Sequence, residues 1–475
     1  MDACRARVLV AAIILALSAS CSPPTGSSGG GDGGGSGPLS PRPFSGVVYD
    51  AVTGAPVSGA LVRFDTDIDT TGSGGAFEFS FSGSLGVHSY PFCVTADGYS
   101  FLYVETLDVD TSYRAELSVG LTRKNPSDYT DTIGIEGTVY HAAGVEIGAA
   151  LVAVSVYGRN GGVQHLGPVD YEDEDAVEVD TAVRSSDALV VFTVTDVGTG
   201  PPPVYEPQPD YIFYVSGVDL SGAGPVEVDI IRPALEAYDA VFLTGAAAGD
   251  TARAYFVGPY PGVPGAFVPA TIDGDPVPGD GLLEPVGFSG NDGRHVAIYN
   301  PFDWETAVFV HQREADTAPG GHGKRYYAAS RAVAPGGTVT LAEIDEDLGP
   351  AAYPDPDTLE YVAADAELRM DPVADADLFV HQLSDISAAG DAVGTVVARH
   401  AAVVLPACLV TEMSDTYVED SFSVFDLALP SLPPSFLESP DVSASSRLGE
   451  VYGTTTQYEG IVNVPPSGTV TIGIE

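Results

Sequence analysis

The sequence predicts an all-β protein built from tandem β-sandwich modules. Its 55 glycines and 37 prolines are spread along 475 residues, which favours many turns and argues against long helices. Hydrophobic residues make up 44% of the chain, a share typical of folded rather than disordered proteins. Short apolar runs are separated by turn signals about every eight to twelve residues. At about 150 residues per domain, several modules are expected.

The charge of the chain excludes one class of function. Lys and Arg number 19 against 66 Asp and Glu, which gives a formal net charge of −47. Nucleic-acid binding needs a basic patch, and none is available, so no nucleic-acid partner is expected. The acidic residues lie throughout the chain, so we expect them to coat the folded modules.

The N-terminal residues have the pattern of a secretory signal peptide, assigned to residues 1–20. Two arginines precede an apolar run at 8–17 that is too short to span a bilayer as a helix. Residues 17–21, LSASC, resemble the lipobox of bacterial lipoproteins. The resemblance implies that Cys21 is diacylated and anchors the mature chain to a membrane, and Ser22 after it implies the outer membrane of a two-membrane envelope. An ordinary signal-peptidase site after Ser20 is the alternative.

Residues 21–43 predict a disordered tether, because they are rich in Gly, Ser and Pro and contain almost nothing to bury. A Gly-rich coil of this length reaches about 25 Å. Beyond it, only Cys93 and Cys408 remain as cysteines. Both lie in apolar runs, so we expect buried thiols rather than a disulfide between distant modules.

The first module is expected over residues 44–123. A strand at 46–50 is followed by Thr53-Gly54-Ala55-Pro56, whose Gly suits a positive φ and whose Pro fixes entry into the next strand. Phe77, Phe79 and Phe81 alternate with polar residues, which predicts one aromatic face on a core. Together with Ala96-Asp97-Gly98-Tyr99, these residues resemble the carboxypeptidase regulatory-like domain. That resemblance implies a transthyretin-like β-sandwich and no reaction.

A second, diverged module of the same type is expected over 132–234. Residues 137–140 repeat the opening strand, and 147–152 repeat 57–62. Matching 211–216 with 90–95 then implies roughly thirty additional residues in between. They include the acidic stretch 170–175 and the prolines at 201–203. Long loops on a sandwich are common binding sites, but a solvated, charge-rich excursion without a partner is the simpler explanation.

The resemblance fades after residue 236, but the strand pattern persists. We expect β-rich domains over 236–348 and 357–475, each ending in a turn and a last strand, at 335–341 and 466–472. Phe-Val-His-Gln occurs at both 309–312 and 379–382, but four residues alone do not establish a duplication.

Metal sites have weak support in the sequence. His311 and Glu314 match the H-x-x-E spacing of zinc carboxypeptidases, but residues three apart on a strand face opposite ways and cannot share a metal. The acidic stretches 65–69 and 273–280 offer oxygen ligands for calcium, yet neither is an EF-hand loop, and alternating Asp residues equally form a solvent face. No cofactor is therefore assigned, with calcium as the one alternative.

None of the common sequence motifs of hydrolases or phosphate-binding loops occurs in the chain. We expect a non-enzymatic, lipid-anchored envelope protein with a structural, adhesive or carbohydrate-binding role and a glycan or protein ligand. Aromatic platforms suit sugars, and Tyr255, Tyr260 and Trp304 are the candidates. The alternative is an envelope hydrolase whose catalytic site lies in residues 236–475, because triads are defined by geometry rather than sequence order.

Overall fold

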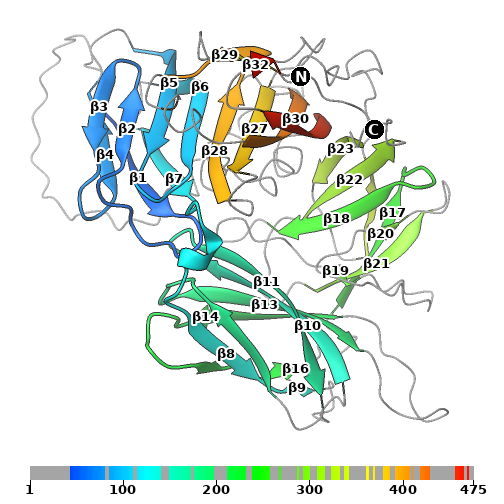
Figure 1. Cartoon of the computed structure of the whole chain (residues 1–475). Coiled ribbons are helices and arrows are strands. Elements are labelled where there is room, and N and C mark those ends of the chain that lie inside the picture. The colour runs from blue at the N-terminus through cyan, green and yellow to red at the C-terminus, as the bar shows by residue number, and fades with distance from the viewer. Residues whose placement is uncertain are drawn as a thin grey trace, which may run out of the picture. The chain divides into compact units, whose positions relative to one another are not determined.

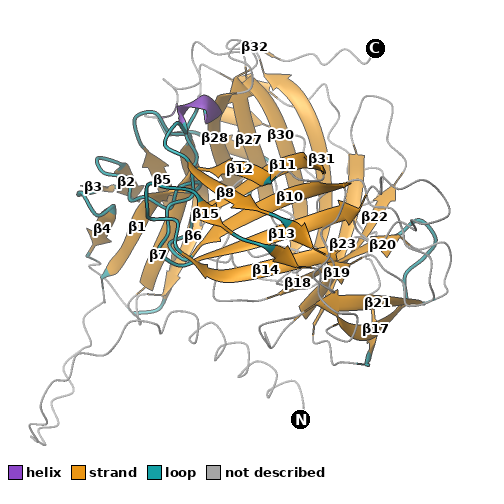
Figure 2. Cartoon of the chain, turned by 90° about the horizontal axis from the view of Figure 1, so that it is seen from below, coloured by secondary structure: helices purple, strands orange, loops and turns teal. Residues whose placement is uncertain are grey.

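The computed structural model is almost entirely β-structure (Figure 2). All described residues lie in one compact unit, 41–475. The structure describes residues 43–80, 85–110, 115–140, 149–172, 176–196, 211–231, 238–256, 267–268, 286–287, 293–299, 307–315, 323–331, 336–341, 360–362, 367–369, 378–385, 391–406, 409, 418–427, 455–464 and 468–469. These residues contain no helix long and apolar enough to cross a bilayer. The predicted fold class, all-β with sandwich modules, is confirmed.

The described residues of module 1 form seven strands, drawn in blue to cyan in Figure 1. They are β1 (Phe44–Asp50), β2 (Leu61–Phe64), β3 (Asp67–Thr70), β4 (Ala76–Phe79), β5 (Val87–Thr95), β6 (Phe101–Asp110) and β7 (Ala115–Leu121). One sheet has the order β4-β1-β7 and the other contains β3-β2-β5-β6. The first and last strands pair in parallel, whereas β1 and β4 are antiparallel. The module is thus a two-sheet sandwich in which the first strand pairs with the last.

The core of module 1 is built from phenylalanine rings, as the alternation predicts. Phe77 and Phe79 are buried, with the exposed Glu78 between them; Phe81 lies outside the described residues. The ring centroids of Phe44 and Phe64 are 4.9 Å apart. Gly54 has a φ of +71°, a conformation that L side chains rarely adopt, so the predicted turn depends on this glycine.

Module 2 follows the short 3-10 helix η1 (Pro126–Asp128) and repeats the strand order of module 1. Its sheets are β12-β8-β15 with the pair β16-β9, and β11-β10-β13-β14. The parallel pairing of first and last strands recurs in β8 with β15 and in β9 with β16. The strands are β8 (Ile133–Gly137), β9 (Val139–Tyr140), β10 (Ala149–Gly158), β11 (Val163–Glu172), β12 (Val177–Thr181), β13 (Ala188–Asp196), β14 (Tyr211–Val218), β15 (Val226–Glu227) and β16 (Ile230–Ile231).

The strand pairing corrects one predicted correspondence between the modules. Val62 pairs with Val94 in module 1, and Val152 pairs with Val194 in module 2. The second pair therefore follows the first by 90 and 100 residues, so only about ten residues are inserted. The strand equivalent to 90–95 is β13, and the match with 211–216 is wrong. Both strands are rich in apolar residues, so the sequence pattern could not tell the central strand from its neighbour.

Module 3 has the same topology, although its sequence resemblance to module 1 is lost. It contains β17 (Tyr238–Thr244), β18 (Thr251–Phe256), β19 (Phe267–Val268), β20 (Val286–Gly287), β21 (Arg294–Tyr299), β22 (Ala307–Ala315), β23 (Gly323–Arg331) and β24 (Thr338–Thr340). The orders are β19-β21-β17-β24 and β20-β18-β22-β23. Strand β17 pairs in parallel with β24, the predicted last strand. Among the described strands of this module, β19 is the one addition to the pattern of module 1.

Module 4 keeps this pattern with a strand added in front. Its strands are β25 (Glu360–Val362), β26 (Glu367–Arg369), β27 (Leu378–Asp385), β28 (Asp391–Ala398), β29 (Ala402–Val404), β30 (Val418–Leu427), β31 (Thr455–Val464) and β32 (Gly468–Thr469). The orders are β29-β26-β25-β32 and β28-β27-β30-β31. Strand β25 is antiparallel to both β26 and β32, so it separates the first and last strands of the common pattern.

The repeated Phe-Val-His-Gln does not mark equivalent positions. His311 lies in β22, the counterpart of β5, whereas His381 lies in β27, the counterpart of β2. Both side chains are buried, at 2% and 1% exposure. Modules 3 and 4 share a strand order, but these four residues lie at different positions in it.

Modules 1 and 4 are joined through their strands and their core. Strand β6 pairs in parallel with β28, and Leu378, Val380 and Val397 belong to the core cluster of module 1. Glu105 accepts hydrogen bonds from the backbone N–H of Arg399 at 2.7 Å and of His400 at 3.2 Å. Strand β23 of module 3 likewise pairs with β31 of module 4. Three modules thus contribute to one twelve-stranded sheet.

Replacing Gly394 by alanine is expected to weaken the contact between modules 1 and 4. A Cβ at this position would lie 2.5 Å from the ring of Phe101, which is 2% exposed and has little room to move. Overpacking of this kind costs about 1–3 kcal/mol. Urea denaturation of Gly394→Ala and of the double variant with Phe101→Leu measures the effect. The smaller leucine should restore part of the loss, and a strictly additive result would contradict the contact.

Candidate functional site

A buried aspartate organises the end of module 1 from which the chain leaves for module 2. Asp50 ends β1 with its side chain fully buried. Its Oδ1 accepts hydrogen bonds from the N–H of Val52 and of Thr53, both at 3.0 Å. Its Oδ2 accepts from Arg123 Nε at 3.0 Å and from the Tyr99 hydroxyl at 3.2 Å. One carboxylate therefore fixes both a turn and the departing chain.

Arg123 holds the link between the modules in place. Its guanidinium lies 4.6 Å from the centroid of the Tyr129 ring, and its Nη1 donates to the carbonyl of Asp128 at 2.6 Å. Burial opposes the charge of Arg123, but the hydrogen bond and charge of Asp50 outweigh it and raise the pKa of the guanidinium. Burial, then the charge of Asp50, raises the pKa of Tyr99, so its hydroxyl keeps the proton that it donates.

The turn between β10 and β11 docks on the same end of module 1. Asn160 Nδ2 donates to the carbonyl of Gly54 at 3.0 Å and to that of Arg184 at 2.8 Å. The N–H of Arg184 donates to the carbonyl of Thr53 at 3.0 Å, and that of Val163 to Ala51 at 2.9 Å. Backbone groups of both modules are thus satisfied across the junction.

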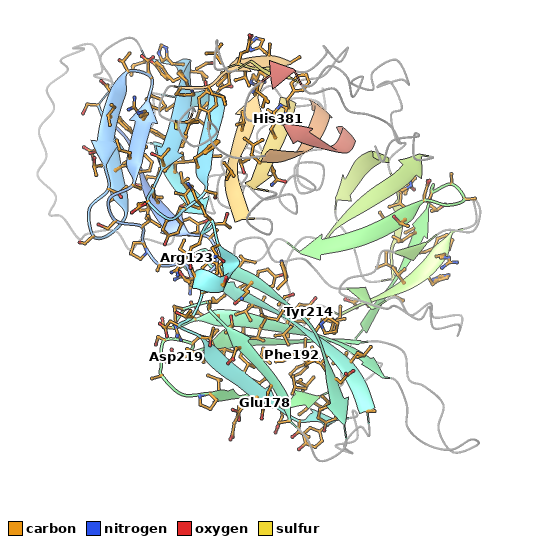
Figure 3. All side chains as sticks on the ribbon, viewed as in Figure 1. Arg123, Glu178, Phe192, Tyr214, Asp219 and His381 are labelled. Carbon is orange, nitrogen blue, oxygen red and sulfur yellow. The ribbon has the colours of Figure 1, made fainter. Side chains whose placement is uncertain are left out.

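Beside this junction, the loops at the end of module 2 line an open pocket of about 820 Å³. Four segments line it: residues 131–132, 159–160, 184–187 and 221–223. Asp219 lies in the loop between β14 and β15, just before the last of these segments. Figure 3 shows Asp219 at this end of module 2, whereas Phe192 lies among the strands. The pocket volume falls within the range of sites for small ligands, about 300–1,000 Å³.

Two ion pairs and several hydroxyl groups form the lining. Arg159 Nη1 lies 2.8 Å from Asp187 Oδ2, and Arg184 Nη2 lies 2.5 Å from Asp131 Oδ1. Nη1 of Arg184 is buried and has no hydrogen-bond partner among the described residues. The rest of the lining consists of Thr132, Asn160, Ser185, Ser186, Ser221, Gly222 and Ala223. The described lining therefore offers both donors and acceptors and contains no aromatic residue.

A second aspartate orders the last lining segment. The hydroxyl of Ser221 donates to Asp219 Oδ1 at 2.6 Å and its N–H donates to the same oxygen at 3.0 Å. These hydrogen bonds lower the pKa of Asp219. The Ser221 loop is thus held by an ionised carboxylate at neutral pH.

Four of the residues singled out in the sequence lie outside the described residues. These are Cys21, Tyr260, Trp304 and Cys408. Tyr255 lies in β18, but its side chain is likewise not described. The aromatic sugar platform therefore stays a prediction. Cys93 is a buried thiol in β5, as expected.

The histidine considered for zinc is enclosed. His311 Nε2 lies 2.7 Å from Asp250 Oδ2, and both side chains are almost fully buried. The same Asp250 oxygen accepts from the N–H of Ala247 at 2.7 Å. The strand expected around His311 and Glu314 is β22, and the pair His311–Asp250 links it to the loop between β17 and β18. This geometry ties a strand to a loop and presents no nucleophile or base to solvent.

No group of three His, Cys, Asp or Glu among the described residues is placed to hold a metal ion. In the stretch 65–69, Asp69 instead accepts from the N–H of Glu78 at 2.9 Å and from that of Thr70 at 2.8 Å. The bond from Glu78 joins β3 to β4. The stretch 273–280 lies outside the described residues.

The pocket itself was missed at the sequence level. Asn160-Gly161-Gly162 is a turn signal, and it does mark the β10–β11 turn. Nothing local, however, indicates that four loops spread between residues 131 and 223 meet around one cavity.

No family model matches the chain, and no curated protein is similar to it. Among solved structures, a streptococcal ancillary pilin is 10% identical, with 63% of this chain and 98% of that chain covered at a TM-score of 0.15. A mutant of the pilus-presented adhesin Cpa is 9% identical, with 63% and 98% covered at a TM-score of 0.16. Another crystal form of that adhesin is 8% identical, with 64% and 98% covered at 0.15. TM-scores this low do not define a shared fold, so the similarity carries no argument about this chain's function.

Proposed function

We propose that the chain is a non-enzymatic, lipid-anchored protein of the bacterial cell envelope that serves as a structural or adhesive element. The lipobox-like residues 17–21 and the Gly-rich residues 22–43 support an anchor followed by a tether. The resemblance of residues 44–123 to the carboxypeptidase regulatory-like domain supports a module that carries structure rather than a reaction. Ser22 after the modified cysteine favours the outer membrane.

The observation that carries the structural role is the way in which the modules are joined. Strand pairing links module 4 to modules 1 and 3. Asn160 and the turn around it link module 2 to module 1 through hydrogen bonds to the backbone of module 1. Flexible tandem domains need no such contacts, because relative motion between domains is the ordinary case. A body of modules joined in this way suits a protein that holds a surface at a distance from its anchor.

The anchor is tested by replacing Cys21 with alanine. The natural chain, produced in a bacterium with two membranes, should incorporate labelled palmitate and sediment with the outer membrane. Cys21→Ala should lose the label, because the thiol that accepts the lipid is gone, and Cys93→Ala is the matched control that should keep it. Palmitate-free natural chain in the soluble fraction would overturn the proposal.

A further inference from the structure

We propose that the pocket at the end of module 2 binds a saccharide that bears a carboxylate, a uronic acid unit or its equivalent. The pocket presents serine and threonine hydroxyls, an asparagine amide and two arginines within about 820 Å³. This proposal gives the adhesive role above a ligand class. Its test uses binding in solution and does not depend on the anchor.

The polyhydroxylated part of the ligand follows from the mixture of hydrogen-bonding groups. A sugar hydroxyl donates and accepts at once, and so do Thr132 and Ser186, both exposed in the lining. Asp187, about one-third exposed, offers carboxylate oxygens beside them. An apolar ligand would gain nothing here, because the lining would lose its contacts with water without replacement.

The carboxylate follows from the two arginines. A guanidinium has five N–H donors in a fork that matches a carboxylate, and each of the two ion pairs uses one nitrogen. Arg159 is 58% exposed in its pair with Asp187, and exposed pairs contribute little, so a ligand carboxylate can share or replace that partner at small cost.

Arg184 strengthens the case. Its Nη1 is buried with no partner among the described residues, although buried donors are nearly always satisfied. Its Nη2 pairs with Asp131, whose side chain is 92% exposed and therefore easily displaced. Two guanidinium groups near one cavity also stand out in a chain with 19 basic and 66 acidic residues.

The test uses trigalacturonate and its neutral counterpart galactotriose, with the full mature chain in calorimetry at constant ionic strength. The natural chain should bind the acidic trisaccharide at least tenfold more tightly than the neutral one. Arg159→Gln should weaken binding of the acidic sugar about tenfold, because a charge-assisted pair is lost. Arg159→Lys should fall between the two, since it keeps the charge and loses the fork.

Arg63→Gln is the matched control, because Arg63 lies in β2 of module 1 and does not line the pocket. It should bind as the natural chain does. A thermal unfolding scan of each variant confirms that the fold is kept. The proposal is overturned by three results: no binding of trigalacturonate at millimolar concentration, equal binding of both sugars, or an equal loss in Arg63→Gln and Arg159→Gln.

Discussion

Asp50→Ala is expected to lower the free energy of unfolding of module 1 by about 3 kcal/mol. A hydrogen bond to a charged group contributes about 1.5–3 kcal/mol. The bonds to Asp50 share one carboxylate, so their contributions do not simply add. The N–H groups of Val52 and Thr53 lose their acceptor, and Thr53 is buried. The pair with Arg123 adds less, because Arg123 is 30% exposed and can turn to water.

Urea denaturation combined with hydrogen exchange measures this loss and its location. Exchange should rise most at residues 50–57, where Asp50 holds the turn, and at the link around Arg123. Asp97→Asn, on an exposed turn residue of the same module, is the control and should change stability by less than about 0.5 kcal/mol. If both variants unfold at the same urea concentration as the natural chain, Asp50 does not organise this end of the module.

The burial of Asp50 could not be predicted from the sequence. An acidic residue directly after an apolar strand normally reaches solvent, and no local pattern marks this one as buried. It is buried because Arg123, 73 positions later, and Tyr99, 49 positions later, meet it in the fold. The alternation of Phe77, Glu78 and Phe79, by contrast, is local information, and it correctly predicts which face is buried.

The same distinction explains the modules. Single strands, and the turn that precedes the last strand of module 3 at Thr338–Thr340, can be predicted from the sequence. Apolar alternation and Gly and Pro turn signals extend over only a few residues, so they can be recognised locally. Which strands pair depends on distant partners, so the shared strand order of modules 3 and 4 with module 1 could not be seen. The pocket is harder still to predict. Its lining comes from four loops, and it exists only because the fold brings these loops together.

The junction that supports this pocket can be tested at a single glycine. In Gly162→Ala, the new Cβ would lie 2.7 Å from the backbone nitrogen of Gly54 and 2.8 Å from the carbonyl carbon of Thr53. Backbone atoms cannot turn aside as a side chain can, so the β10–β11 turn must lift from module 1. We expect a loss of about 2 kcal/mol. Hydrogen exchange at the N–H of Val163, which donates to Ala51, should accelerate with it.

Gly167→Ala is the matched control, because Gly167 lies in the strand β11 that follows the same turn and a Cβ there meets nothing within 4 Å. It should leave both the stability and the Val163 exchange rate unchanged. Arg159 and Arg184 flank the docked turn and the contact with Thr53, so Gly162→Ala should also weaken trigalacturonate binding while Gly167→Ala does not. Equal behaviour of the two alanine variants would mean that the turn does not bear on module 1, and that the pocket keeps its shape without the junction.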